Sequence, residues 1–203
     1  MRSKILLAVL SIASSFVTNA QINKGAILIG GSFGYNTTNN NQVNNTLSYS
    51  NTNISPRFSY AIGHNSLIGL KIGFNYAKNK SVNNNYSTNT SFGSNLFWRN
   101  YFSIKNKLGW YTELQGGIGK TISKTTFSSS TTKNKSTNYS IGAIPGLFFQ
   151  AAPRLQVTAD FGGVNYSHSS YKNSIGNTTD NSNTFGISLF SSFAVGVDFI
   201  LTK

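Results

Sequence analysis

The chain has 203 residues, of which 10% are charged and 13% aromatic, with 19 Gly, 3 Pro and no Cys. The absence of Cys excludes a disulfide scaffold and cysteine-ligated zinc sites. This length suits one domain with a full set of strands. Lys and Arg outnumber Asp and Glu by 17 to 4, so the chain is strongly basic.

The first twenty residues have the order of a secretory signal peptide. Arg2 and Lys4 precede an apolar run, and Thr18-Asn19-Ala20 supplies the small residues of a cleavage site. We therefore predict a signal peptide over residues 1–20, cleaved after Ala20, and one domain over residues 21–203; an uncleaved anchor is the alternative. An exported basic chain would meet anionic lipid or polysaccharide rather than nucleic acid.

Apolar residues alternate with small or polar ones along most of the mature chain, which is the period of a β-strand. In residues 66–78, for example, Ile68, Ile72 and Phe74 share one parity, whereas Gly69 and Lys71 share the other. The same pattern predicts eight strands, over residues 25–36, 50–62, 66–78, 89–103, 108–120, 138–150, 154–166 and 185–201. No later segment has the roughly 18 consecutive apolar residues that a membrane helix needs, so membrane residence would require strands.

The connections between these strands alternate in length. Short turns are predicted at residues 63–65, 104–107 and 151–153, and long polar tracts rich in Asn, Ser, Thr and Lys at residues 37–49, 79–88, 121–137 and 167–183. Short turns on one rim and long loops on the other are typical of outer-membrane barrels. The sequence thus predicts an all-β fold, an eight-stranded antiparallel up-and-down transmembrane β-barrel with its N-terminus on the periplasmic side.

Residues 24–203 resemble the small outer-membrane β-barrel family that includes the OmpA-type transmembrane domain and OmpX-like proteins. The local sequences that carry the resemblance are GAILIGGSFGY at residues 25–35 and FWRNYF at residues 97–102. The resemblance implies residence in the outer membrane, insertion by the barrel-insertion machinery and no cofactor.

Six charged residues fall on the parity that would face the lumen. They are Arg57, Lys71, Arg99, Glu113, Asp160 and Asp198, three of each sign. Their distances from the short turns predict one belt in the periplasmic half of the lumen. Because buried charges are tolerated when paired, we expect this network to plug the barrel and fix its register. The alternative is that each charge is separately solvated in a wet lumen.

Motifs for catalysis or metal binding are weak, and we expect no catalytic, cofactor-binding or metal residues. Gly119-Lys120-Thr121 resembles the end of a phosphate-binding loop but is followed by no predicted helix. His64 and His168 would lie at opposite rims, too far apart to share a metal. A lipid-modifying enzyme with a Ser, His and carboxylate set would have to use His168 and Asp180.

Lysines gather in the predicted outer loops, and two interpretations stay open for them. They would keep polar loops soluble, or they would contact phosphate groups of surface glycolipid or an unidentified anionic ligand. The predicted function is a structural or surface-interaction role in the outer membrane. A narrow porin-like channel for small solutes is the alternative, although side chains just fill an eight-stranded barrel. A lipid-modifying enzyme is the third reading.

Overall fold

The computed structural model describes residues 22–42, 45–80, 85–105, 107–127, 130–172, 179–188 and 194–201, and the predicted signal peptide lies outside them. The regular elements described are all β-strands. They are β1 (Ile27–Gln42), β2 (Asn45–Gly63), β3 (Ser66–Lys80), β4 (Tyr86–Lys105), β5 (Leu108–Phe127), β6 (Ser130–Ala152), β7 (Leu155–Asp160), β8 (Val164–Lys172), β9 (Thr179–Ile187) and β10 (Ala194–Leu201). Within these ranges no helix is long and apolar enough to span a membrane.

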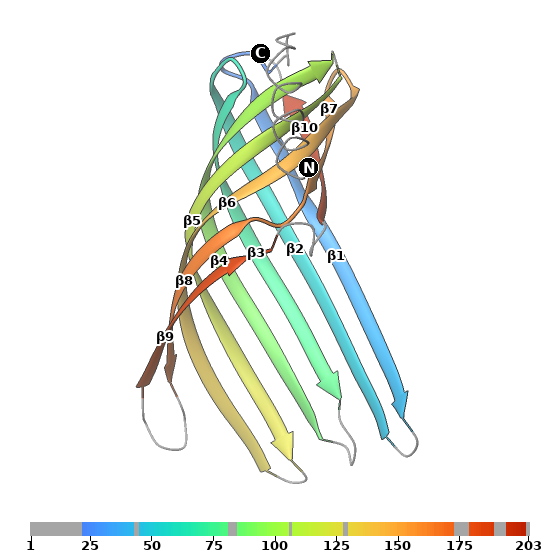
Figure 1. Ribbon diagram of the computed structural model, residues 1–203, viewed down its shortest axis with the longest axis vertical. Coiled ribbons are helices and arrows are strands. Elements are labelled where there is room, and N and C mark those ends of the chain that lie inside the picture. The colour runs from blue at the N-terminus through green and yellow to red at the C-terminus, as the bar shows by residue number, and fades with distance from the viewer. Residues whose placement is uncertain are drawn as a thin grey trace, which may run out of the picture.

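The strands form a closed antiparallel ring (Figure 1). Each strand from β1 to β6 pairs with the next one in the chain, β7 pairs with β10, and β10 pairs with β1. β8 extends the seventh barrel strand and β9 extends the eighth, and the two pair with each other. The predicted all-β, eight-stranded antiparallel barrel is therefore confirmed.

Alternation places the predicted faces on opposite sides of the wall. Outward side chains such as Phe58, Phe74 and Leu114 are 51%, 44% and 50% exposed, whereas inward Phe97 and Tyr111 are buried. Large apolar side chains encircle the outside of the wall, where a soluble protein would carry polar ones. This arrangement is the inverse of a soluble core and suits a lipid environment.

The prediction of four long loops was wrong, because strands run through most of the polar tracts. β1 and β2 pair as far as Gln42↔Asn45, β3 and β4 as far as Lys80↔Tyr86, and β5 and β6 as far as Phe127↔Ser130. β8 and β9 pair as far as Lys172↔Thr179. Paired backbone groups satisfy one another whatever the side chains are, so Asn, Ser and Thr continue the ladders as polar hairpins.

The prediction that residues 154–166 and 185–201 form two unbroken strands was also wrong. Phe161, Gly162 and Gly163 separate β7 from β8, and Gly162 has a φ of 79°. A Cβ at Gly162 would lie 1.6 Å from the Ser188 carbonyl oxygen, so only glycine fits there. Between Asp160 and Val164 the chain contains one more residue than the segment of β6 that faces it. This extra residue changes the parity, so that odd-numbered Asn165 faces inward just as even-numbered Asp160 does.

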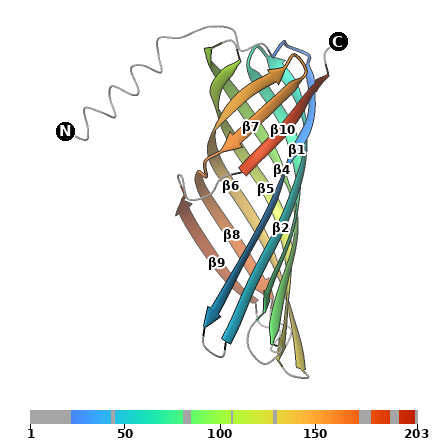
Figure 2. The same cartoon turned by 90° about the vertical axis from the view of Figure 1, so that its right-hand side faces the viewer.

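Among the described residues, the ring of paired strands is closed only toward the short turns. β10 pairs with β1 from Ile27↔Leu201 to Ser32↔Gly196. Beyond Ser32, no described residue pairs with this edge of β1, and the β8–β9 hairpin leans away from it (Figure 2). The polar hairpins therefore extend from a barrel whose closed section lies toward the short turns.

An apolar cluster fills the barrel at the short-turn rim. Ile22 lies ahead of β1, is 2% exposed, and its carbonyl oxygen accepts a hydrogen bond from the Asn65 amide in the β2–β3 turn. The cluster comprises Ile22, Ala26, Leu28, Ala61, Leu67, Tyr101, Tyr111, Phe148 and Ile200. The charged side chains lie against this cluster.

Candidate functional site

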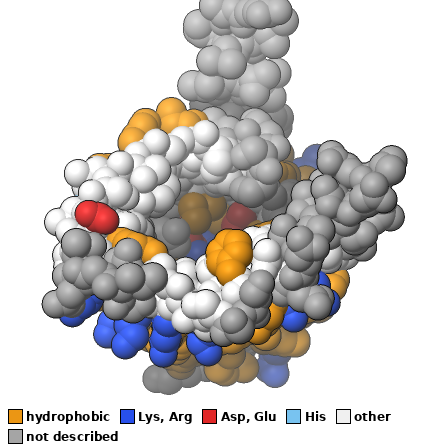
Figure 3. All heavy atoms as spheres, turned by 90° about the horizontal axis from the view of Figure 1, so that it is seen from below, with side chains coloured by type: hydrophobic (Ala, Val, Ile, Leu, Met, Phe, Trp, Pro, Cys, Tyr) orange, Lys and Arg blue, Asp and Glu red, His pale blue; other side chains and the backbone are white. Residues whose placement is uncertain are grey.

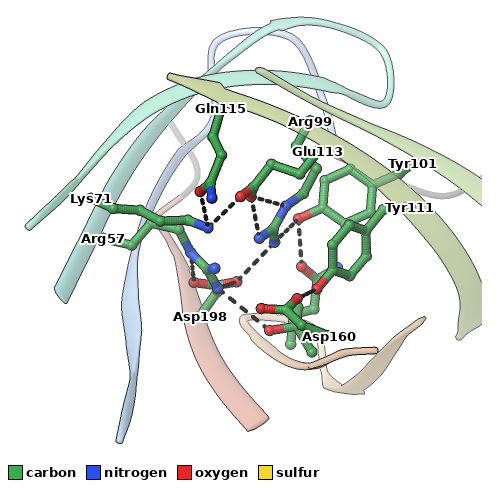
Figure 4. A network of polar contacts seen from close by, with 11 residues as sticks. Arg57, Lys71, Arg99, Tyr101, Tyr111, Glu113, Gln115, Asp160 and Asp198 are labelled. Carbon is green, nitrogen blue, oxygen red and sulfur yellow. Dashed lines mark hydrogen bonds and ion pairs between the residues drawn. The ribbon is translucent and has the colours of Figure 1, made fainter. Parts of the chain in front are cut away.

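Three charged side chains from neighbouring strands meet at one end of the site. Arg99 on β4 and Glu113 on β5 are directly opposite in the ladder. The Arg99 Nε and Nη2 groups donate to Glu113 Oε2 at 2.9 and 2.6 Å, and Lys71 on β3 donates to the other carboxylate oxygen of Glu113 (Figure 4). One buried carboxylate thus balances two cations.

A second carboxylate balances the third cation. Arg57 on β2 donates from Nε to Asp198 Oδ1 at 3.0 Å and from Nη2 to Asp198 Oδ2 at 2.6 Å. This fork is the strongest geometry for an arginine–carboxylate pair. Arg99 Nη1 lies 3.8 Å from Asp198 Oδ2, which connects this pair to Glu113. Five of the six predicted charges therefore form one continuous network across the lumen.

The sixth charged residue, Asp160, ends β7 and makes a different contact. Its carboxylate accepts a hydrogen bond from the Tyr111 hydroxyl and has no salt bridge with the described cations. The Arg99 guanidinium stacks 4.1 Å above the Tyr111 ring. Tyr111 therefore joins Asp160 to the other charges through its ring and its hydroxyl.

Polar residues that the sequence analysis did not select complete the site. The Tyr101 hydroxyl donates to Gln156 Oε1 at 3.0 Å and lies 3.2 Å from Arg99 Nη1. Thr158 accepts from Arg57 at 3.4 Å, and Gln115 accepts from Lys71 at 3.4 Å. Their inward parity was readable from the sequence, but uncharged side chains of one parity are too numerous to single out without the register.

Inward glycines make room for these side chains. Gly30 lies directly opposite Asp198, and a Cβ there would lie 2.1 Å from Asp198 Oδ1. Gly146 lies directly opposite Tyr111, and its Cβ would lie 2.3 Å from the Tyr111 ring. Pairing small with large residues lets side chains fill a narrow barrel.

The network is closed to solvent on the short-turn side. Arg99 and Glu113 are 0% exposed and Asp198 is 1% exposed, and the apolar cluster lies next to them. Toward the hairpins the inward residues are mostly Gly, Ser, Asn and Thr, and a cavity of about 280 Å³ lies beside Asp160 at the β7–β8 interruption. The lumen is thus filled at one end and wider at the other, and Figure 3 shows the hollow from the hairpin end.

No family model matches the chain, and no curated protein matches it. Among solved structures, the translocator domain of the autotransporter NalP from Neisseria meningitidis is similar over 100% of this chain and 76% of its own, with 15% identity and a TM-score of 0.48. Neisserial surface protein A (NspA) is similar over 86% of this chain and 95% of its own, with 12% identity and a TM-score of 0.39. The strand pairing itself shows an eight-stranded antiparallel β-barrel. Its location in an outer membrane and its relation to OmpA-type and OmpX-like proteins stay predictions.

The weaker motifs are not assembled into a site. Gly119-Lys120-Thr121 lies within β5 rather than in a loop at a helix start. His168 faces outward on β8, where its Nδ1 lies 2.8 Å from Asn183 Oδ1, whereas Asp180 has the opposite parity on β9. The structure therefore does not bring His168 and Asp180 together, and the described residues contain no cluster of three or more metal-ligating side chains.

Proposed function

We propose that this protein is an integral outer-membrane β-barrel with a structural or surface-interaction role and without catalytic activity. In this proposal the lumen is plugged by the charge network, and four polar hairpins project outside the cell. The observation that carries the proposal is the continuous set of salt bridges from Lys71 to Arg57, buried within a barrel whose outside is apolar.

Two features support the proposed plug, namely the width of the barrel and the geometry of the network. An eight-stranded barrel is only wide enough for its own side chains. Arg57 and Lys71 are directly opposite each other on neighbouring strands and reach carboxylates on β10 and β5, respectively. A permeating ion would have to separate these pairs, and breaking a buried pair costs about 3 to 5 kcal/mol.

Planar-bilayer conductance tests the plug. The unmutated protein should give no steady current, and an Arg57→Ser/Arg99→Ser variant should give stepwise openings because both bridging guanidinium groups are removed. Asn53→Ala is the control, since Asn53 faces inward on β2 nearer the hairpin end. Steady current through the unmutated protein would instead support the porin-like channel. If the double variant also stays closed, the apolar cluster, rather than the network, is the barrier.

A further inference from the structure

The lysines of the hairpin half all lie on the outside of the wall. They are Lys78 and Lys80 on β3, Lys120 and Lys124 on β5, Lys133 and Lys135 on β6, and Lys172 on β8, and we call them the lysine belt. Each shares the parity of exposed apolar residues on its strand, such as Tyr76, Ile118 and Tyr139. Inward positions described in the same segments carry no Lys or Arg. If the lysines served only solubility, we would expect them on both faces of the hairpins, because both faces meet water.

The lysine belt begins where the apolar band ends. On β3 the outward sequence passes from Phe74 through Tyr76 to Lys78. On β5 Lys120 follows Ile118, and the outward Ile122 lies between Lys120 and Lys124, so lysines and apolar side chains overlap there by one position. Two residues of strand span about 7 Å. Aromatic residues mark the interfacial level of membrane barrels, so the ammonium groups would lie at the depth of lipid headgroups.

Two pairs of these lysines are placed against each other. Lys124 is directly opposite Lys133, and Lys135 is directly opposite Lys172. Like charges directly opposite on one face destabilise a sheet. None of the salt bridges among described residues involves them. An external anion between the paired ammonium groups would remove this repulsion.

The lysine belt covers one arc of the barrel. The described parts of β1, β2 and β9 carry no outward Lys or Arg, whereas β3, β5, β6 and β8 do. Figure 3, viewed from the hairpin end, shows basic side chains gathered along one side of the outer wall. Charge serving only solubility would have no reason to avoid part of the circumference.

We propose that the lysine belt is a binding site for the phosphate groups of anionic lipid headgroups, held against the outside of the barrel. The occupant is a membrane lipid rather than a soluble polyanion because the lysines continue the lipid-facing side of the wall. This inference rests on the proposed membrane location. The partner in the proposed surface interaction is then the lipid of the leaflet that surrounds the hairpins.

The test compares two variants with equal loss of charge. The belt variant carries Lys124→Gln, Lys133→Gln, Lys135→Gln and Lys172→Gln. The control carries Lys24→Gln, Lys105→Gln, Lys107→Gln and Arg154→Gln, at exposed positions of the short-turn rim. The probe is dioctanoyl phosphatidic acid titrated into the detergent-solubilised full mature protein. Binding should be at least about tenfold weaker in the belt variant and unchanged in the control, since one lysine near an anionic lipid surface corresponds to about a fivefold change.

Several outcomes would overturn the proposal. Equal weakening in both variants would indicate general charge attraction, and no weakening in either would remove the site. Inorganic phosphate that binds as tightly as phosphatidic acid would assign the lysines to soluble anions. If the belt variant does not fold, the Lys124→Gln/Lys133→Gln pair replaces it, with Lys105→Gln/Lys107→Gln as its control.

Insertion into phosphatidylcholine vesicles is measured separately, by electrophoresis with and without heating. Failure of the unmutated protein to insert would reject both the proposed function and this site. Normal insertion without phosphatidic acid binding would reject the site alone.

Discussion

Glu113 is the residue on which the free energy of the charge network depends most. Its side chain is 0% exposed. One carboxylate oxygen accepts two hydrogen bonds from Arg99, at 2.6 and 2.9 Å, and the other accepts one from Lys71. Glu113→Gln preserves the shape, removes the charge, and leaves two buried cations facing an amide. Removing one partner of a buried pair costs about 3 to 5 kcal/mol, and we expect the free energy of unfolding to fall by that amount.

A double-mutant cycle separates this effect from a simple change of volume. Arg99→Met removes the cation that donates two hydrogen bonds to Glu113, so Glu113→Gln should cost less in that background. The two effects should differ from additivity by about 1 to 3 kcal/mol, the range for residues in one network. The measurement is urea unfolding in vesicles, followed by the fraction that migrates as folded protein without heating.

Asp180→Asn is the matched control, because Asp180 is an exposed carboxylate on β9. A surface change of this kind should alter the free energy of unfolding by less than about 0.5 kcal/mol. A Glu113→Gln variant as stable as this control, or strictly additive effects in the cycle, would refute the network as a source of stability.

Two further predictions concern the membrane. Val195 is 45% exposed on the outside of β10, so Val195→Arg should reduce folding into vesicles by about 2 to 4 kcal/mol if it lies near the bilayer midplane. Its neighbour Ala194 has inward parity, and Ala194→Ser should have little effect; equal losses would refute the assigned faces. An epitope inserted between β5 and β6 should react with antibody on intact cells, whereas one inserted after His64 should react only after permeabilisation, and the opposite pattern would reverse the orientation.

The sequence alone predicted which side chains face the lumen and which face outward, because the alternation of apolar and polar residues can be read within each strand. Each strand needs only its own residues to determine which parity is apolar, and Arg57, Lys71 and Asp198 could be assigned inward one strand at a time. Which charges meet depends on register. Asp160 bonds to Tyr111 rather than to a cation because an uncharged residue two strands away is the nearest partner.

The errors arose where composition was used in place of pairing. Tracts rich in Asn, Ser and Thr were assigned to loops, yet such residues pair well when each strand has a hairpin neighbour and both faces meet water. The Gly162-Gly163 pair did mark an interruption in the predicted seventh strand. A glycine pair in a sequence does not tell whether the strand bulges or whether another backbone passes close by, and both occur at Gly162.

Closing the ring is the one step of assembly that joins distant parts of the chain. The pairs from β1–β2 to β6–β7 are consecutive in the chain, and β7 and β10 are separated only by β8 and β9, whereas β1 and β10 are the first and last strands described. Arg57 and Asp198 are 141 residues apart and meet across this seam, over Gly30, where a side chain would collide with the carboxylate. Bringing such distant segments together carries the largest loop-closure entropy in the molecule. We therefore expect hairpins to form first and the seam to close last, with the Arg57–Asp198 pair governing how fast a closed barrel reopens into a sheet.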